Sequence, residues 1–251
     1  MTIRNHIAFR TGGRLLATFR HWLWPLIIVL AMAISLPAFA DYFAKAKQAY
    51  EATDYKSAVR MLRPLARKGD PRAQLLLGSA YFSGEGVGFD FKKARYWLER
   101  AVAQNHTPAF APLGQLLLKT NKGRDERGLD LIRTAVGRGD AQGQLALGWL
   151  YFVGQGGVAT DLEKSRRLLL KSAEQKHKLV FSLLTFWYAS DRGKKPDNVE
   201  ALKWAIIDTR IGVGVAADIH RAKALKALTK DQIAEAKRRA AAWLKVHWET
   251  P

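Results

Sequence analysis

The stretch "QLLLGSAYFSGEG", Gln74 to Gly86, recurs 70 residues later as "QLALGWLYFVGQG", Gln144 to Gly156. Over the slightly wider segments 69–86 and 139–156, ten of the eighteen positions are identical. Similarity at a fixed spacing is the signature of a protein built from structural repeats. The chain is therefore expected to consist of several copies of one unit.

Weaker copies of this unit occur between and after the two strong ones. The copies can be aligned on a single marker position, which is spaced at 36, 34 and 37 residues and is occupied by Gly78, Gly114, Gly148 and Thr185. Within each copy, apolar residues follow at intervals of three and four, as on one face of an α-helix. A period near 35 with this pattern predicts an all-α fold, a right-handed superhelical solenoid of stacked helix–turn–helix repeats.

The glycines in the repeat serve two different purposes. A glycine inside a helix costs about 1 kcal/mol relative to alanine, so Gly78, Gly114 and Gly148 predict a close approach of a neighbouring helix. Gly84 and Gly86 follow the first helix and predict a turn that requires positive φ. They are not interpreted as a phosphate-binding loop, because no Gly-Lys-Ser/Thr follows and the preceding segment is helical. The second helix of each strong copy is expected to begin near an acidic N-cap, Asp90 or Asp161.

The segments Ala73–Asn105 and Gly139–Lys176 resemble the Sel-one-like repeat family, which is related to the tetratricopeptide repeats. In the first segment the family pattern falls on Ala73, Leu77, Gly78, Tyr81, Gly84, Gly86, Val87, Asp90, Lys93, Ala94, Trp97 and Ala101. In the second, Leu168 or Leu169 replaces the tryptophan. The resemblance implies an adaptor that binds other proteins and has no catalytic activity.

The repeats occupy residues 70–212 of the expected domain organisation. Residues 41–69 resemble a tetratricopeptide-like opening unit, and residues 213–251 are expected to form a C-terminal helical cap. Thr229 and Gln232 have the spacing of a capping box. The helix that follows should cover the last apolar surface of the solenoid with one face, which carries Ile233, Ala236, Ala240, Trp243 and Leu244.

Residues 1–40 have the features of a secretory signal peptide. Their only charged side chains are arginines, the apolar run Leu23–Ile34 follows, and Ala38 and Ala40 fit cleavage before Asp41. The alternative is an uncleaved inner-membrane anchor, because the uncharged run 22–40 is nearly long enough to cross a bilayer. Both interpretations place the remaining chain outside the cytoplasm, in the periplasm or secreted.

The composition narrows the classes of function. The chain contains no cysteine, which excludes disulfides, thiolate metal sites and a cysteine nucleophile. Hydrolysis of a cell-wall-like or β-lactam substrate, an activity attributed to cysteine-rich relatives, is therefore not expected. The formal charge is +19, of which +15 remains after cleavage before Asp41. This charge opens an alternative function, binding of an anionic envelope polymer such as peptidoglycan or acidic exopolysaccharide, or of a membrane surface. No nucleic-acid-binding motif is present.

No constellation of residues indicates catalysis, a metal or a cofactor. The six histidines are scattered, and His106 and His177 hold the same position in two repeats. No serine lies in a nucleophile-elbow context. Asp125 and Glu126 lie in the degenerate turn of the second copy and are interpreted as solvated acids. The protein is predicted to be no enzyme, to use no cofactor and to bind a protein partner that the sequence does not identify.

The candidate partner-binding residues are those that differ between copies. Most repeat aromatics are expected to pack between helices. Trp149 is the exception, because the equivalent positions hold Ser79 and Gln115. A tryptophan on the concave face would be a suitable binding anchor. Arg166 and Arg167 form a basic pair that is interpreted as part of a solvated face, with contact to an acidic partner as the alternative.

Overall fold

The structure, a computed structural model, describes residues 42–123, 125–192, 195–211 and 217–248. The expected signal peptide lies outside the described residues. Residues 42–51 are helical, and the described part of the chain contains no strand. The helices that follow are, in chain order, α2 (Tyr55–Arg67), α3 (Pro71–Ser83), α4 (Phe91–Ala103), the short 3₁₀ helix η1 (Thr107–Ala109), α5 (Phe110–Thr120), α6 (Glu126–Gly137), α7 (Ala141–Val153), α8 (Leu162–Glu174), α9 (Val180–Ala189), α10 (Asn198–Ile211), α11 (Ala217–Ala227) and α12 (Lys230–His247).

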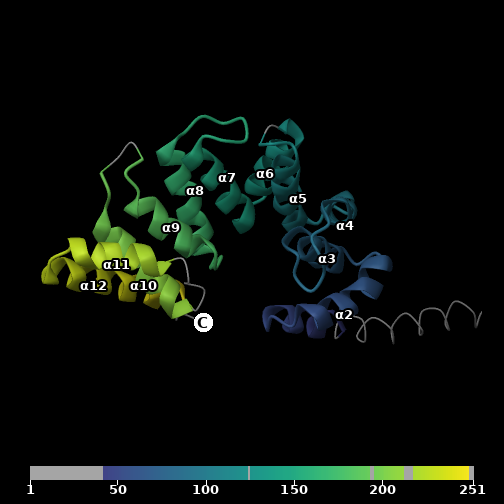
Figure 1. The fold of residues 1–251 in the computed structure, drawn as a ribbon, viewed down its shortest axis with the longest axis horizontal. Coiled ribbons are helices and arrows are strands. Elements are labelled where there is room, and N and C mark those ends of the chain that lie inside the picture. Colours follow the sequence, from purple (N-terminus) through teal and green to yellow (C-terminus); the bar gives the residue numbers. More distant parts are fainter. Residues whose placement is uncertain (1–41, 124, 193–194, 212–216, 249–251) are drawn as a thin grey trace, which may run out of the picture.

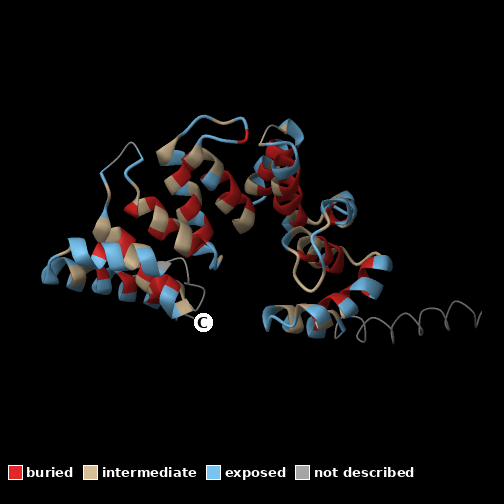
Figure 2. Ribbon diagram, in the orientation of Figure 1, coloured by how far each residue is buried: buried red, intermediate tan, exposed pale blue. Residues whose placement is uncertain are grey.

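Successive helices pack in pairs, α3 with α4, α5 with α6, α7 with α8 and α9 with α10. The pairs follow one another around an arch, and α2 and the α10–α12 group lie at its two ends (Figure 1). The stack thus consists of helix–turn–helix units with the predicted period. The buried residues run along the interior of the helix layers, and the outer turns are exposed (Figure 2).

The marker glycines lie where two helices come into contact. A Cβ atom on Gly78 would lie 2.8 Å from Leu98 Cγ, and one on Gly148 would lie 2.9 Å from Leu169 Cδ2. These distances confirm the predicted close approach. Because Leu169 takes the place of Leu98, the residue that replaces Trp97 is Leu168.

The middle unit achieves the same approach with a second glycine that the sequence analysis did not single out. A Cβ on Gly114 would lie 2.5 Å from the carbonyl oxygen of Gly128, and one on Gly128 would lie 2.9 Å from the carbonyl oxygen of Gly114. Here backbone contacts backbone. This unit therefore tolerates a side chain at neither position without a shift of the helices.

The predicted turns and caps are present in both strong copies. Gly84 and Gly154 have φ of 77° and 70° and end α3 and α7 in the left-handed conformation. The carboxylates of Asp90 and Asp161 each accept a hydrogen bond of 2.9 Å, from the backbone N–H of Lys93 and of Lys164. Such N-caps satisfy donors that a helix would otherwise leave unpaired.

Asp125 has a structural role that the sequence analysis did not assign. It is not merely a solvated acid of the degenerate turn, because its carboxylate accepts a hydrogen bond of 2.7 Å from Gly128 N–H and caps α6. The acid therefore begins a helix here, as Asp90 and Asp161 do in the strong copies.

The C-terminal helix α12 packs against α10. Its capping box between Thr229 and Gln232 is formed, as predicted. On its inner face Ala236, Ala240 and Leu244 are buried. In addition, α11 packs against α9 and α10, an element that the sequence analysis did not resolve. Within the described residues, no helix combines the length and the apolar character needed to cross a bilayer.

Candidate partner-binding site

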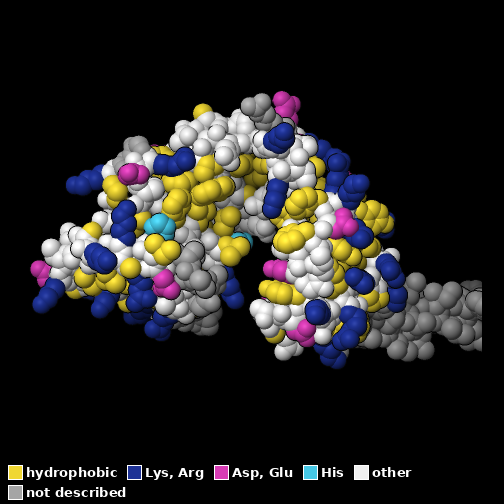
Figure 3. All heavy atoms as spheres, in the orientation of Figure 1, with side chains coloured by type: hydrophobic (Ala, Val, Ile, Leu, Met, Phe, Trp, Pro, Cys, Tyr) yellow, Lys and Arg dark blue, Asp and Glu magenta, His cyan; other side chains and the backbone are white. Residues whose placement is uncertain are grey.

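A pocket of about 830 Å³ lies between α5 and α7. Its walls are Gln115, Leu118 and Lys119 of α5, Ile132 of α6, Ala146, Trp149 and Leu150 of α7, and the loop residues Lys122, Gly123, Gln155 and their neighbours. The inner side of the arch is concave in the space-filling view, and this concave surface is called the hollow (Figure 3). Figure 3 shows that hydrophobic side chains gather in the hollow, whereas Lys and Arg side chains are scattered mainly around the outside of this face. The pocket is thus formed between two repeats rather than within one.

Trp149 forms one wall of the pocket and is 37% exposed. Its ring lies 5.7 Å from that of Phe152 and 6.2 Å from that of Phe186, between centroids, in tilted contacts. Phe152 is fully buried. The indole is therefore held by the core on one side and open to the hollow on another, which favours a preorganised contact surface.

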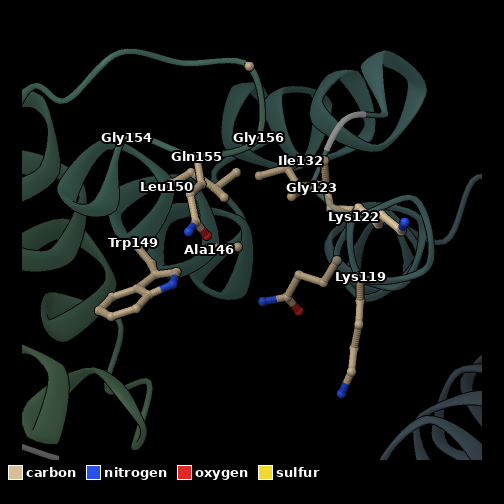
Figure 4. Close-up of a pocket in the computed structure, with 13 residues that line it drawn as sticks. Lys119, Lys122, Gly123, Ile132, Ala146, Trp149, Leu150, Gly154, Gln155 and Gly156 are labelled. Atoms are coloured by element: carbon tan, nitrogen blue, oxygen red, sulfur yellow. The ribbon is translucent and has the colours of Figure 1, made fainter.

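Polar side chains converge on the space beside Trp149. Figure 4 shows Gln155 pointing into the pocket, the indole nitrogen of Trp149 on the side that faces it, and Lys119 extending into the open space below α5. The Lys119 ammonium lies 5.1 Å from the ring centroid of Phe82 and 5.5 Å from that of Phe91. The ammonium of Lys122 points away from the pocket in the same view.

The structure brings together two of the five predicted contact residues, Trp149 and Gln115. Ser79 lies half-buried on α3 and does not line the pocket. Arg166 and Arg167 lie on α8, which contributes no residue to the pocket. The Arg166 guanidinium binds the Glu163 carboxylate at 3.0 Å, which raises the pKa of Arg166.

Lys119 and Gln155 were not singled out from the sequence. One signal was available for Lys119, because it lies four residues after Gln115 and so on the same helical face. No such signal existed for Gln155, whose position depends on how the turn after α7 folds back toward α5.

The described residues contain no cluster of three His, Asp or Glu side chains that could hold a metal ion. Burial lowers the pKa of His177, an effect that the charge of the Asp140 carboxylate partly opposes. Burial also lowers the pKa of His106, the equivalent residue of the first copy. Both histidines follow a helix that ends a repeat, which makes them boundary residues of the stack.

Three segments of the chain, residues 71–106, 141–177 and 186–206, match the family described as Sel1 repeat. The chain is 30% identical over 121 residues to an uncharacterized protein of Neisseria meningitidis serogroup B; the alignment covers 48% of this chain and 24% of that protein. It is 28% identical over 173 residues to the Sel1-repeat-containing protein YjcO of Escherichia coli K12, and this alignment covers 67% of this chain and 70% of that protein. A sel1 repeat protein from Klebsiella pneumoniae subsp. pneumoniae has a crystal structure that is similar with a TM-score of 0.54 at 18% identity, covering 74% of this chain and 92% of that one.

The matched segments correspond to α3–α4, α7–α8 and part of α9–α10, and residues 107–140 between them hold the degenerate unit. The similar crystal structure confirms the prediction of an all-α solenoid, and three segments of this chain are similar to the Sel1 repeat. Repeats of this kind generally mediate contacts between proteins and are typically non-catalytic.

Proposed function

We propose that this protein is an exported, non-catalytic adaptor of the bacterial cell envelope that binds a partner protein in the hollow of its solenoid. The observation that carries the proposal is the exposed Trp149 in a pocket between α5 and α7. Tryptophan is enriched among the residues that dominate binding energy at protein interfaces. The repeat itself does not require a tryptophan, because the equivalent positions of the other copies hold Ser79, Gln115 and Phe186.

The direct test is site-specific photocrosslinking in the native envelope. A benzophenone side chain in place of Gln155 would lie in the pocket, and the same group in place of Tyr96 on α4 serves as the matched control. Tyr96 is 52% exposed, and its helix contributes no residue to the pocket. We expect a protein adduct of defined mass from position 155 and none from position 96. Recovery of no adduct at position 155, or of the same adducts from both positions, would contradict the proposal.

Export rests on the first forty residues, which carry the signal-peptide pattern. N-terminal sequencing of the protein recovered from the envelope should begin at Asp41. A chain that retains the apolar run Leu23–Ile34 and stays in the membrane fraction would instead support the anchor, with the repeats facing the periplasm. Recovery of the intact chain from the cytoplasm would contradict export.

Binding of an anionic polymer is less well supported by the placement of the charges. Many basic side chains on the helices lie beside an acid, for example Lys93 with Asp90 at 2.9 Å and Lys164 with Asp161 at 3.1 Å. Such pairs are typical of solvated helix surfaces. Retention on peptidoglycan or acidic polysaccharide that falls steeply with salt, together with no protein adduct, would favour the polymer instead.

A further inference from the structure

The pocket beside Trp149 offers hydrogen-bond donors without matching acceptors. The indole N–H of Trp149 can only donate, and it has no hydrogen-bond acceptor within the described parts of the chain. The Lys119 ammonium likewise only donates, and among the described residues no carboxylate lies within 4.0 Å of it. Two side chains of the same surface are therefore ready for a ligand rich in acceptors.

Gln115 adds to this imbalance. Its Oε1 atom accepts a hydrogen bond of 3.2 Å from Nε2 of Gln142. The acceptor of this amide is thereby engaged with a neighbouring repeat, while its NH₂ group remains available. Gln155, exposed in the turn after α7, supplies a second amide that points into the pocket (Figure 4). Amides of this kind suit the backbone of an extended peptide.

The apolar part of the surface extends to both sides of Lys119. Toward α7 lies the indole of Trp149, and toward α3 and α4 lie the rings of Phe82 and Phe91, over which the ammonium rests. Phe91 is 38% exposed. A ligand that places a carboxylate at Lys119 would therefore meet aromatic rings beside it.

The surface next to the pocket is acidic on one side, which would orient a charged ligand within the site. A second pocket shares Gly156 and Gly157 with the first, and Asp125, Glu126 and Asp130 line it. Arg133 pairs with Asp130 at 3.3 Å, so acids remain in excess on that side. An anionic ligand is repelled from the acidic side and attracted toward Lys119.

We infer that the pocket between α5 and α7 takes an acidic peptide segment of the partner, with a carboxylate at Lys119 and an adjacent apolar side chain against Trp149. This inference rests on the proposed function and names the chemistry of the partner. A peptide fits better than an acidic polysaccharide, because the lining beside the indole is largely aliphatic and suits an apolar side chain rather than a row of sugar hydroxyls. The apolar lining residues of the pocket include Leu118, Ile132 and Leu150, and an aliphatic or aromatic side chain of the peptide would pack against them.

The test uses fluorescein-labelled nonapeptides that place one Phe or Leu between two Glu residues on a Ser-Gly background, with Gln replacing Glu in the matched set. Fluorescence anisotropy with the purified full chain measures their affinities, and oligogalacturonate is titrated in parallel. We expect the Glu peptides to bind more tightly than the Gln peptides. The Lys119→Ala variant should weaken the Glu peptides by about fivefold and leave the Gln peptides unchanged.

The Lys92→Ala variant is the control for net charge. Lys92 is exposed on α4, outside the pocket, and its removal should leave both affinities unchanged. Equal binding of the Glu and Gln sets, equal effects of the two lysine variants, or tighter binding of oligogalacturonate than of any peptide would overturn the inference. Absence of peptide binding while the crosslinked partner is still recovered would overturn the inference but leave the adaptor function standing.

Discussion

The α3–α4 and α7–α8 units place the same kinds of residue at the same structural points, except at a position that faces the hollow. In each unit, both helices begin at an aspartate N-cap of their own, a glycine contacts a leucine of the partner helix, and a lysine lies over a tyrosine ring. Each unit also has a glutamine pair at 2.8 Å, Gln74 with Gln104 and Gln144 with Gln175. At the differing position stand Ser79 and Trp149.

This difference distinguishes residues that build the scaffold from residues that are available for recognition. The features that recur are those that any copy needs in order to stack, namely caps, turns and close helix contacts. The first two copies stack with Ser79 and Gln115 at this position, whereas the last copy has Phe186, which lies against Trp149. Stacking therefore does not require the exposed part of the Trp149 indole, and four experiments can test whether that part serves recognition.

The largest effect should come from the helix contacts. Gly114→Ala places a Cβ 2.5 Å from a backbone oxygen that cannot move alone, so we expect a loss of about 3 kcal/mol in the free energy of unfolding. The Cβ atom of Gly78→Ala meets the side chain of Leu98 instead, which can shift, and alanine has the higher helix propensity. We therefore expect a smaller loss, of about 1 kcal/mol in the free energy of unfolding. Urea unfolding followed by circular dichroism measures both.

Gly137→Ala is the control for these two variants. Gly137 ends α6, and a Cβ atom added there would have no neighbour within 4 Å, so the substitution should be neutral or slightly stabilising. If Gly114→Ala were as stable as Gly137→Ala, the glycine contact between α5 and α6 would not be a packing requirement.

Exchange of the differing residue tests recognition. Trp149→Ser gives the second strong copy the residue of the first and should weaken partner binding by about 30-fold, because an interface anchor is lost. Titration of the identified partner measures the affinity, and circular dichroism on the same samples verifies the fold. Ser79→Trp, outside the pocket, should leave the affinity unchanged. Retention of full affinity by a folded Trp149→Ser variant would rule out the anchor.

Asp70 and Asp140 cap the first helices of the two units, and their contributions to stability should change with pH in opposite directions. Burial would raise the pKa of Asp70, but hydrogen bonds from Arg72 and from Ala73 N–H outweigh it and lower the pKa. Asp70 therefore stabilises the fold above its unfolded pKa of about 3.9, and this stability is lost as the pH falls through the folded pKa. Asp70→Asn should thus lose about 0.5 kcal/mol at neutral pH.

At Asp140 the balance is reversed. Burial raises the pKa of Asp140 despite hydrogen bonds from Gly143 and Gln142 N–H and the nearby His177. The stability that Asp140 contributes is present below its unfolded pKa and is lost as the pH rises through its pKa in the folded chain. Asp140→Asn, which keeps a cap, should therefore be neutral or stabilising at pH 7. Thermal unfolding of both variants across pH is the measurement, and equal losses at neutral pH would contradict the contrast.

The smallest expected change concerns His177. Burial lowers its pKa, so the unfolded chain binds a proton more readily, and stability should fall as the pH drops below the unfolded pKa of about 6.5. His177→Asn should flatten that part of the profile of unfolding temperature against pH. An unchanged slope between neutral and mildly acidic pH would mean that His177 is not its source.

Much of the scaffold could be predicted from the sequence because it depends on residues close together in the chain. A cap needs an acid before a helix, a positive-φ turn needs a glycine after one, and a period near 35 residues specifies stacking. Asp90, Asp161, Gly84 and the capping box at Thr229 were all assigned in this way. Comparison of aligned copies also singled out Trp149, which the structure places in the wall of a pocket.

Tertiary structure decided what lies beside Trp149. The distance between α5 and α7 depends on how the middle unit packs, and that packing rests on Gly128 facing Gly114, a pairing that no local pattern indicates. It brings Lys119 and Gln155 to one pocket from separate repeats and leaves Arg166 and Arg167 outside it. The same holds for the opposite pKa directions of Asp70 and Asp140, which occupy one repeat position but differ in burial and in their charged neighbours. Repetition in the sequence specifies the units, whereas the contacts between units determine which side chains meet.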